Sequence, residues 1–129
     1  MPKESILVVD DNPMNLKLAR LLLGTEGYEV RTAGRAEEAL AVLQSYHPRV
    51  ILMDVQLPGI DGLELTRQIK SDPSFRDIII LAVTAYAMAS DEKRAFEAGC
   101  DGYITKPIDT RSLGELVRTY LDHPAGQDG

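Results

Sequence analysis

The sequence predicts an α/β protein in which a five-stranded parallel sheet carries helices on both faces. Five short apolar runs alternate with five stretches of helical periodicity along the 129 residues. Such alternation is typical of consecutive βα units around a parallel sheet. Two of the apolar runs, at 50–53 (VILM) and 78–83 (IIILAV), contain no polar residue. This is expected of strands that are buried on both faces.

The other three strands each contain at least one polar residue. The first is expected at 5–9 (SILVV), directly before two aspartates. Residues 28–33 (YEVRTA) alternate apolar and polar side chains, as an edge strand covered on one side does. The last strand is expected at 102–105 (GYIT).

Clear start and stop signals mark the first helix. Asn12 is a suitable N-cap and Pro13 a suitable first helical residue, and Gly24 and Gly27 indicate the end. Helical spacing assigns its apolar face to Met14, Leu18, Leu21 and Leu22.

Helical spacing also predicts the four later helices. The second helix covers 36–43. The third begins at Asp61 and runs to about residue 71, and Glu64 completes a capping-box pattern at its start. The fourth, at 90–98, has a thin apolar face and should be held loosely. That face consists of Ala95, Phe96 and Ala98. The fifth has a full stripe of Leu113, Leu116, Val117, Tyr120 and Leu121.

Composition fits one domain, expected at 1–122, with a flexible tail at 123–129. A net charge of −6 argues against nucleic-acid binding, which needs a basic face. No apolar run is long enough to span a membrane and no signal peptide is visible. We therefore expect a cytoplasmic protein that binds neither nucleic acid nor membrane. The single cysteine, Cys100, is interpreted as a small buried apolar residue.

Polar residues stand where the predicted strands end. Asp10 and Asp11 follow the first strand, Asp54 the third, Thr84 the fourth and Lys106 the fifth. Because parallel strands bring their carboxyl ends to one edge, these side chains should converge there. Any one of them alone would more simply be a turn, cap or surface residue.

Together these groups favour phosphoryl chemistry. Three carboxylates in one crevice repel one another unless a cation neutralises them, and Mg²⁺ prefers carboxylate oxygens and retained waters. Lys106 and Thr84 add an ammonium and a hydroxyl for an anionic ligand. Asp54 is the best nucleophile, because it is central and carboxylates form acyl phosphates.

With these motifs in this order, the chain resembles a response-regulator receiver domain of two-component signalling over about residues 3–121. The matching motifs are VVDDN, LMDVQLPGIDG, AVTAY and YITKP. The resemblance implies a flavodoxin-like (βα)5 fold, doubly wound, with strand order 2-1-3-4-5. The segment NPMN at 12–15 resembles a variant common in stand-alone, chemotaxis-like or cell-cycle receivers and in receivers attached to hybrid kinases.

The resemblance implies a phosphorylation-dependent switch. Asp54 would accept a phosphoryl group from a histidine kinase or a histidine phosphotransfer protein. Asp11, Asp54 and the backbone carbonyl of Gln56 would bind Mg²⁺, with Asp10 acting through water and Mn²⁺ serving as a substitute metal. The protein would catalyse only its own phosphotransfer and slow self-dephosphorylation.

The resemblance also assigns the readout. Lys106 would pair with the phosphoryl oxygens, Thr84 would move to bond one of them, and Tyr103 would turn inward as the switch aromatic. The Lys106–Pro107 peptide bond would be cis. A downstream protein would bind the face formed by the fourth helix, the fifth strand and the fifth helix, on a monomer or weak dimer.

Other readings of the sequence fit less well. A phosphatase-like hydrolase with a nucleophilic aspartate normally has a second acid two residues after the nucleophile. In this chain the residue two positions after Asp54 is Gln56, and the residue two positions after Asp10 is Asn12, so neither is an acid. A flavodoxin-like electron carrier would need a hydroxyl- and glycine-rich phosphate loop after the first strand, where this chain is acidic. The complete set of acids, threonine and lysine argues against a receiver that takes no phosphate and acts only as a scaffold. A receiver cut from a longer regulator or hybrid kinase is the alternative that stays open.

Overall fold

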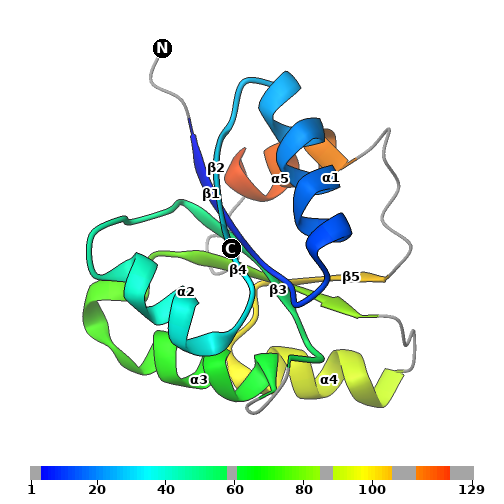
Figure 1. Ribbon diagram of the computed structural model, residues 1–129. Coiled ribbons are helices and arrows are strands. Elements are labelled where there is room, and N and C mark those ends of the chain that lie inside the picture. Colours follow the sequence, from blue (N-terminus) through cyan, green and yellow to red (C-terminus); the bar gives the residue numbers. More distant parts are fainter. Residues whose placement is uncertain (1–3, 58–60, 85–88, 106–112, 123–129) are drawn as a thin grey trace.

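The computed structural model describes residues 4–57, 61–84, 89–105 and 113–122, with the side chains of 89–91 and 105 left aside. In these ranges one parallel sheet lies between two layers of helices (Figure 1). The strands are β1 (Ser5–Val9), β2 (Glu29–Ala33), β3 (Val50–Asp54), β4 (Ile79–Thr84) and β5 (Gly102–Thr105). The helices are α1 (Pro13–Thr25), α2 (Ala36–Leu43), α3 (Gly62–Ser71), the short 3₁₀ helix η1 (Pro73–Phe75), α4 (Ala89–Ala98) and α5 (Leu113–Asp122). Lys106, Pro107 and the tail at 123–129 lie outside the described residues, so the predictions made for them stay predictions.

The strand order is β2-β1-β3-β4-β5, and every pair is parallel. This confirms the predicted fold class, a doubly wound flavodoxin-like sheet. The register pairs Val9 with Met53 and Asp54 with Val83, so each of β1, β3 and β4 ends within one residue of its neighbour. Their carboxyl ends form the open edge at which ligands of such sheets bind.

Two apolar cores fill the space on either side of the sheet. One joins the strands to α2, α3 and α4, and the other joins them to α1 and α5. Figure 1 shows the same division, with α1 and α5 on one side and α2, α3 and α4 opposite. The interior strands β3 and β4 are buried along their whole length, as expected of two strands with no polar residue before their last position.

The prediction for the apolar face of α1 was wrong. Met14, Leu18 and Leu21 are 71%, 44% and 64% exposed, whereas Ala19 and Leu23 are buried. Leucines occupy most of the circumference of this helix, so spacing alone could not select its inner side. The small Ala19 packs on the sheet, and an apolar stripe is left on the outer surface.

The helix α4 buries fewer apolar side chains than its sequence indicated. Ala95 and Ala98 are buried, but Phe96 is 47% exposed and does not belong to the core. Among the described side chains of α4, only two methyl groups therefore pack fully against the sheet. Because an alanine buries little area, each contributes little hydrophobic stabilisation.

The corner after α4 is fastened more firmly by polar contacts. Lys70, near the end of α3, lies 3.0 Å from an Asp101 carboxylate oxygen and donates to the backbone oxygen of Ile78 at 2.6 Å. The same Asp101 oxygen accepts from the Ile80 amide at 2.9 Å. These bonds tie α3, the start of β4 and the approach to β5 together, at the end of α4 far from the strand tips.

Cys100 is buried at this corner, as predicted, with its Sγ 3.9 Å from the Thr66 hydroxyl. Burial raises the pKa of this thiol from 9.0 to about 11. Because the thiolate is the reactive form, iodoacetamide at pH 8 should modify the folded chain about 100-fold more slowly than the urea-unfolded chain. Intact-mass time courses measure both rates, and equal rates would contradict the burial.

The same thiol makes the stability of the fold depend on pH. A folded-state pKa above the unfolded value favours the neutral thiol in the fold, so this contribution to stability is present below pH 9 and is lost as the pH rises toward about 11.

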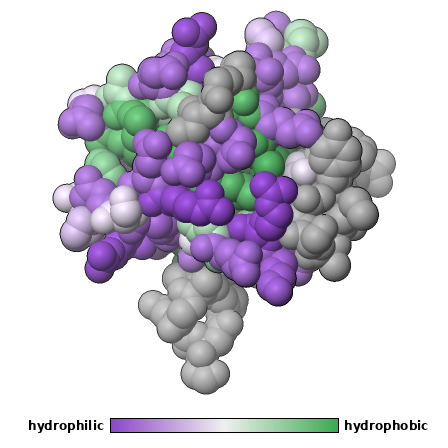
Figure 2. All heavy atoms as spheres, turned by 90° about the horizontal axis from the view of Figure 1, so that it is seen from below, coloured by the Kyte–Doolittle hydropathy of each residue, from purple (hydrophilic) through white to green (hydrophobic). Residues whose placement is uncertain are grey.

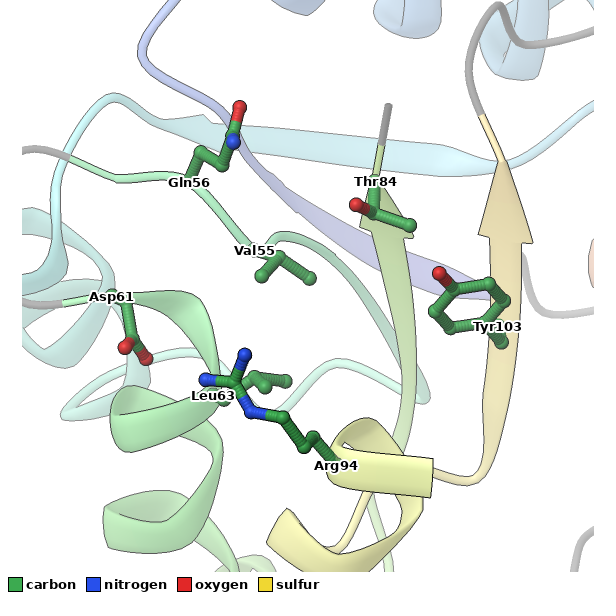
Figure 3. A pocket seen from close by; sticks show the side chains of 7 residues that line it. All are labelled: Val55, Gln56, Asp61, Leu63, Thr84, Arg94 and Tyr103. Atoms are coloured by element: carbon green, nitrogen blue, oxygen red, sulfur yellow. The ribbon is translucent and has the colours of Figure 1, made fainter. Parts of the chain in front are cut away.

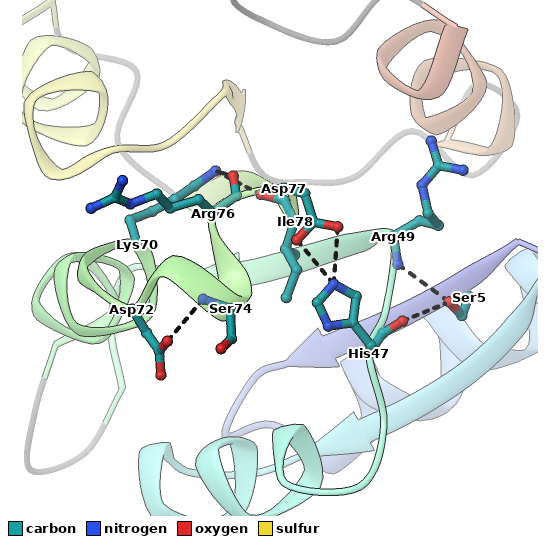
Figure 4. Close-up of polar contacts among 9 residues, drawn as sticks. All are labelled: Ser5, His47, Arg49, Lys70, Asp72, Ser74, Arg76, Asp77 and Ile78. Carbon is teal, nitrogen blue, oxygen red and sulfur yellow. Dashed lines mark hydrogen bonds and ion pairs between the residues drawn. The ribbon is translucent and has the colours of Figure 1, made fainter.

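The opposite edge of the sheet is closed by side chains that link the strand entries (Figure 4). The Ser5 hydroxyl accepts from the Arg49 amide at 3.2 Å and donates to the His47 carbonyl at 3.5 Å. His47 also pairs with Asp77 at 3.0 Å. Such exposed contacts stabilise little individually. They connect the starts of β1, β3 and β4, at the end of the sheet opposite the acids.

The surface on the side of α3 and α4 is mostly hydrophilic, with hydrophobic residues exposed only in patches between the polar ones (Figure 2). In the part of the chain that the structure describes, no helix is both long and apolar enough to cross a bilayer.

Candidate phosphoryl and metal site

Three carboxylates meet at the open edge of the sheet, as the strand ends predicted. Asp54 is the last residue of β3, and Asp10 and Asp11 directly follow β1. One oxygen from each lies within 4.8 Å of the others. Asp10 and Asp54 are only 5% and 4% exposed, while Asp11 is open to solvent. Since like charges at this spacing repel, the cluster is suited to hold a cation.

Backbone amides orient the two buried acids. The Asn12 amide donates to Asp10 Oδ1 at 2.9 Å, and the Gln56 amide donates to Asp54 Oδ1 at 3.0 Å. Each acid thus receives the N–H group two residues further along, as short acidic turns do. These bonds fix where the carboxylates point before any ligand arrives.

The start of α1 is built on the same turn. The Asn12 side chain accepts from the Met14 amide at 2.9 Å, and Pro13 occupies the first helical position. Both features confirm the predicted cap. Because the cap follows Asp11 directly, it fixes the position of α1 relative to the acids.

The donor set fits a hard divalent cation. All three side chains offer carboxylate oxygens, which Mg²⁺ prefers, and the exposure of Asp11 leaves room for retained waters. No soft or nitrogen ligand belongs to this cluster of described residues. The metal contact predicted for the Gln56 carbonyl stays a prediction.

Thr84 and Tyr103 border a hollow beside the acids. Its volume is about 290 Å³, and its lining also includes Val55, Gln56 and Arg94. Thr84, the last residue of β4, is 2% exposed, and Tyr103 on β5 is half-buried. Figure 3 shows the Thr84 hydroxyl and the Tyr103 ring on neighbouring strands. The predicted switch pair therefore shares one pocket, which adjoins Asp54 through Gln56.

Sequence reasoning missed Arg94. Its side chain extends from α4 into the same hollow, toward Leu63 and the Asp61 end of α3 (Figure 3). A signal existed, because Arg94 precedes the buried Ala98 by four residues and so lies on the same side of the helix.

The structural importance of Gly62 was also not predicted, although Gly62 is the last residue of the motif LMDVQLPGIDG. Its amide donates to the Val55 carbonyl at 2.8 Å, and a Cβ built there would collide with the Asp54 carbonyl oxygen. Asp61 caps α3 by accepting from the Glu64 amide at 2.8 Å, as predicted. The start of α3 therefore lies directly against the end of β3, and only glycine allows this approach.

Comparisons with known proteins agree with this geometry. Residues 6–118 match the family described as response regulator receiver domain. The polar-differentiation response regulator DivK of Brucella ovis is 43% identical over 118 residues, which cover 92% of this chain and 96% of that protein.

Two solved structures show how widely the similarity extends. A putative response regulator from Chloroflexus aurantiacus has a TM-score of 0.88 at 35% identity, over 94% of this chain and 99% of the other. The receiver domain of the sensor histidine kinase PA1611 from Pseudomonas aeruginosa has a TM-score of 0.84 at 30% identity, with the same coverages. That domain was solved with a magnesium ion coordinated in its active site cleft.

The family match also argues against the two other classes of protein, a phosphatase-like hydrolase and a flavodoxin-like electron carrier. The fold, the acidic cluster at its open edge and these matches lead to one assignment. This chain belongs to the response regulator receiver domain family of two-component signalling.

Proposed function

We propose that this chain is a phosphorylation-dependent switch in which Asp54 is the phosphoryl acceptor. The observation that carries the proposal is the position of this carboxylate. It is 4% exposed, its Oδ1 is held by the Gln56 amide, and it lies with Asp10 and Asp11 at the open edge of the sheet. A nucleophile that is oriented in advance needs little reorganisation during the reaction.

Asp11, Asp54 and the Gln56 carbonyl would hold Mg²⁺, with Asp10 acting through water. When bound, the metal supplies the positive charge that lets an anionic phosphoryl group approach three acids. Lys106, outside the described residues, would pair with the phosphoryl oxygens. The presence of magnesium in the PA1611 receiver domain supports the choice of ion.

The proposed reaction is a direct transfer from a histidine kinase or histidine phosphotransfer protein. An Asp54 carboxylate oxygen forms a bond to phosphorus while the phosphorus–nitrogen bond of the donor phosphohistidine breaks. The electron pair of the broken bond stays with the donor imidazole. The product is an acyl phosphate on Asp54, which hydrolyses slowly to return the carboxylate and inorganic phosphate.

The pocket beside Thr84 offers a route for the readout. The phosphoryl group brings about one additional negative charge and strong acceptor oxygens, toward which the Thr84 hydroxyl would turn. Tyr103 borders the same 290 Å³ hollow and would turn into it. Because the described part of α4 buries only alanines, this helix would shift most easily.

A downstream protein would then bind the surface formed by α4, β5 and α5. Exposure of Phe96 on α4 supports this choice, because a phenylalanine that is 47% exposed offers an aromatic contact for a partner. A cytoplasmic location and a monomeric or weakly dimeric state stay predictions.

The phosphodonor would dock along α1. The exposed stripe of Met14, Leu18 and Leu21 starts beside the acidic cluster, and a donor histidine must reach Asp54 from a surface that borders it. Leu18→Glu should therefore slow transfer from a phosphorylated histidine phosphotransfer protein at least tenfold, since it places a charge in the contact. Labelling by acetyl phosphate, which needs no docking, should not change. Equal slowing with both donors would contradict the assignment.

One experiment tests the switch as a whole. The wild-type chain is incubated with acetyl phosphate and MgCl₂, or with acetyl phosphate and EDTA, and analysed by intact mass and by amide exchange. We expect one phosphoryl adduct only with Mg²⁺, and altered exchange in residues 89–105 of the same sample. No adduct would refute the acceptor chemistry, and an adduct without an exchange change there would refute the proposed readout surface.

A further inference from the structure

One polar residue near the acids has no role in the switch described above. Asn15, in the first turn of α1, is half-buried, and its side-chain Nδ2 donates to Asp10 Oδ2 at 3.2 Å. The Asn12 amide donates to the other oxygen, Oδ1, at 2.9 Å. Both oxygens of Asp10 are therefore bonded from the turn that begins α1.

The position of Asn15 is set by the cap of the helix. Asn12 accepts from the Met14 amide through its side chain and from the Leu16 amide at 3.1 Å through its backbone. The segment from Asp10 to Asn15 thus closes on itself through hydrogen bonds. A rotation of the Asp10 carboxylate would break its bonds to both asparagines.

A small cavity lies against Asp10 and Asn15 and against a second acid of the cluster, Asp54. Its volume is about 20 Å³, and it is lined by Asp10, Asn15 and Asp54 together with apolar residues of the sheet and α1. This is enough for about one water molecule, which needs two or more polar partners. Asn15 therefore contacts the interior side of the acidic cluster, away from the exposed Asp11.

We propose that Asn15 is a positioning residue of the metal site: through its amide bond to Asp10, it holds that carboxylate in the orientation that a divalent cation requires. This inference rests on the proposed function, because it assumes that the acids bind Mg²⁺. Residues that orient the ligands of a metal commonly change its affinity 10- to 100-fold when replaced. The amide also opposes the tendency of three repelling acids to turn apart.

The test compares two substitutions of similar size. Asn15→Leu removes the donor, and Asn15→Gln keeps an amide that can reach Asp10. MgCl₂ is titrated into each variant and into the wild type, and the dissociation constant is read from amide NMR shifts. We expect a dissociation constant about tenfold higher for Asn15→Leu and close to the wild-type value for Asn15→Gln.

A second readout separates positioning from chemistry. At saturating MgCl₂, the rate of adduct formation with acetyl phosphate should return to within about twofold of wild type in Asn15→Leu, because only the metal affinity is changed. Thr25→Ala, which removes a side-chain bond to the Leu22 carbonyl at the far end of α1, controls for general weakening of the helix and should bind Mg²⁺ like wild type.

Several results would overturn the inference. These are wild-type affinity in Asn15→Leu, equal weakening in Asn15→Leu and Asn15→Gln, and equal weakening in Thr25→Ala. If the wild-type chain itself bound no Mg²⁺, the proposed function would fail first, and the titration shows this before any variant is compared.

Discussion

Asp54→Asn is expected to abolish the phosphoryl adduct that acetyl phosphate and Mg²⁺ form on the wild-type chain. The substitution keeps the size of the side chain and its ability to accept from the Gln56 amide, so the loop after β3 should hold its shape. An amide oxygen, however, is a poor nucleophile and cannot form an acyl phosphate. The acceptor is lost while its surroundings are kept.

Intact-mass analysis measures the result, and peptide mapping of the wild-type adduct should place it on the peptide that contains Asp54. Asp72→Asn is a matched control, because Asp72 caps η1 by accepting from the Ser74 amide at 2.9 Å, far from the open edge, and asparagine caps equally well. This variant should be labelled like wild type. An adduct of undiminished yield on Asp54→Asn would assign the acceptor to another residue.

Gly62→Ala is expected to lower the free energy of unfolding by about 3 kcal/mol, near the upper end of the range for overpacking. The added methyl group would collide with the Asp54 carbonyl oxygen and lie 3.0 Å from Val55 Cα. Both neighbours are backbone atoms next to the last β3–β4 contacts, so they cannot move aside as a flexible side chain would. Relief of the collision would displace the strand end that carries Asp54.

Urea unfolding of the metal-free chain measures this loss. Gly24→Ala provides the control, because no atom lies within 4 Å of the Cβ position in this helical glycine. Alanine is the better helix former, so that variant should gain up to about 1 kcal/mol. Stability of Gly62→Ala within about 0.5 kcal/mol of wild type would show that the loop relaxes without strain.

Much of the site was predictable because its residues stand at strand ends. Once five strands are parallel, Asp10 and Asp54 must reach the same edge whatever loops follow them. The caps at Asn12 and Asp61 were predictable for a similar reason, since each depends on a bond to an amide two or three residues away. Local chemistry of this kind is visible in the order of the residues.

Contacts between elements were harder to predict. Arg94 reaches the pocket of Thr84 and Tyr103 from another part of the chain, and its place in the lining depends on how α4 is rotated above β4 and β5. Phe96, assigned to the core by spacing, is instead exposed because α4 packs through Ala95 and Ala98. On a helix with few apolar residues, one step of rotation exchanges a core residue for a surface residue.

The sequence by itself determined the parallel sheet, its buried centre and the convergence of the acids, because strand periodicity and strand ends follow from the chain alone. Only the tertiary structure decided which side of α1 meets the sheet. Leucines lie almost all round that helix, and packing selected the side with the small Ala19, which lets the helix axis approach the strands. That choice leaves Met14, Leu18 and Leu21 exposed in a stripe that starts beside the acids, and Asn15 bonded to Asp10.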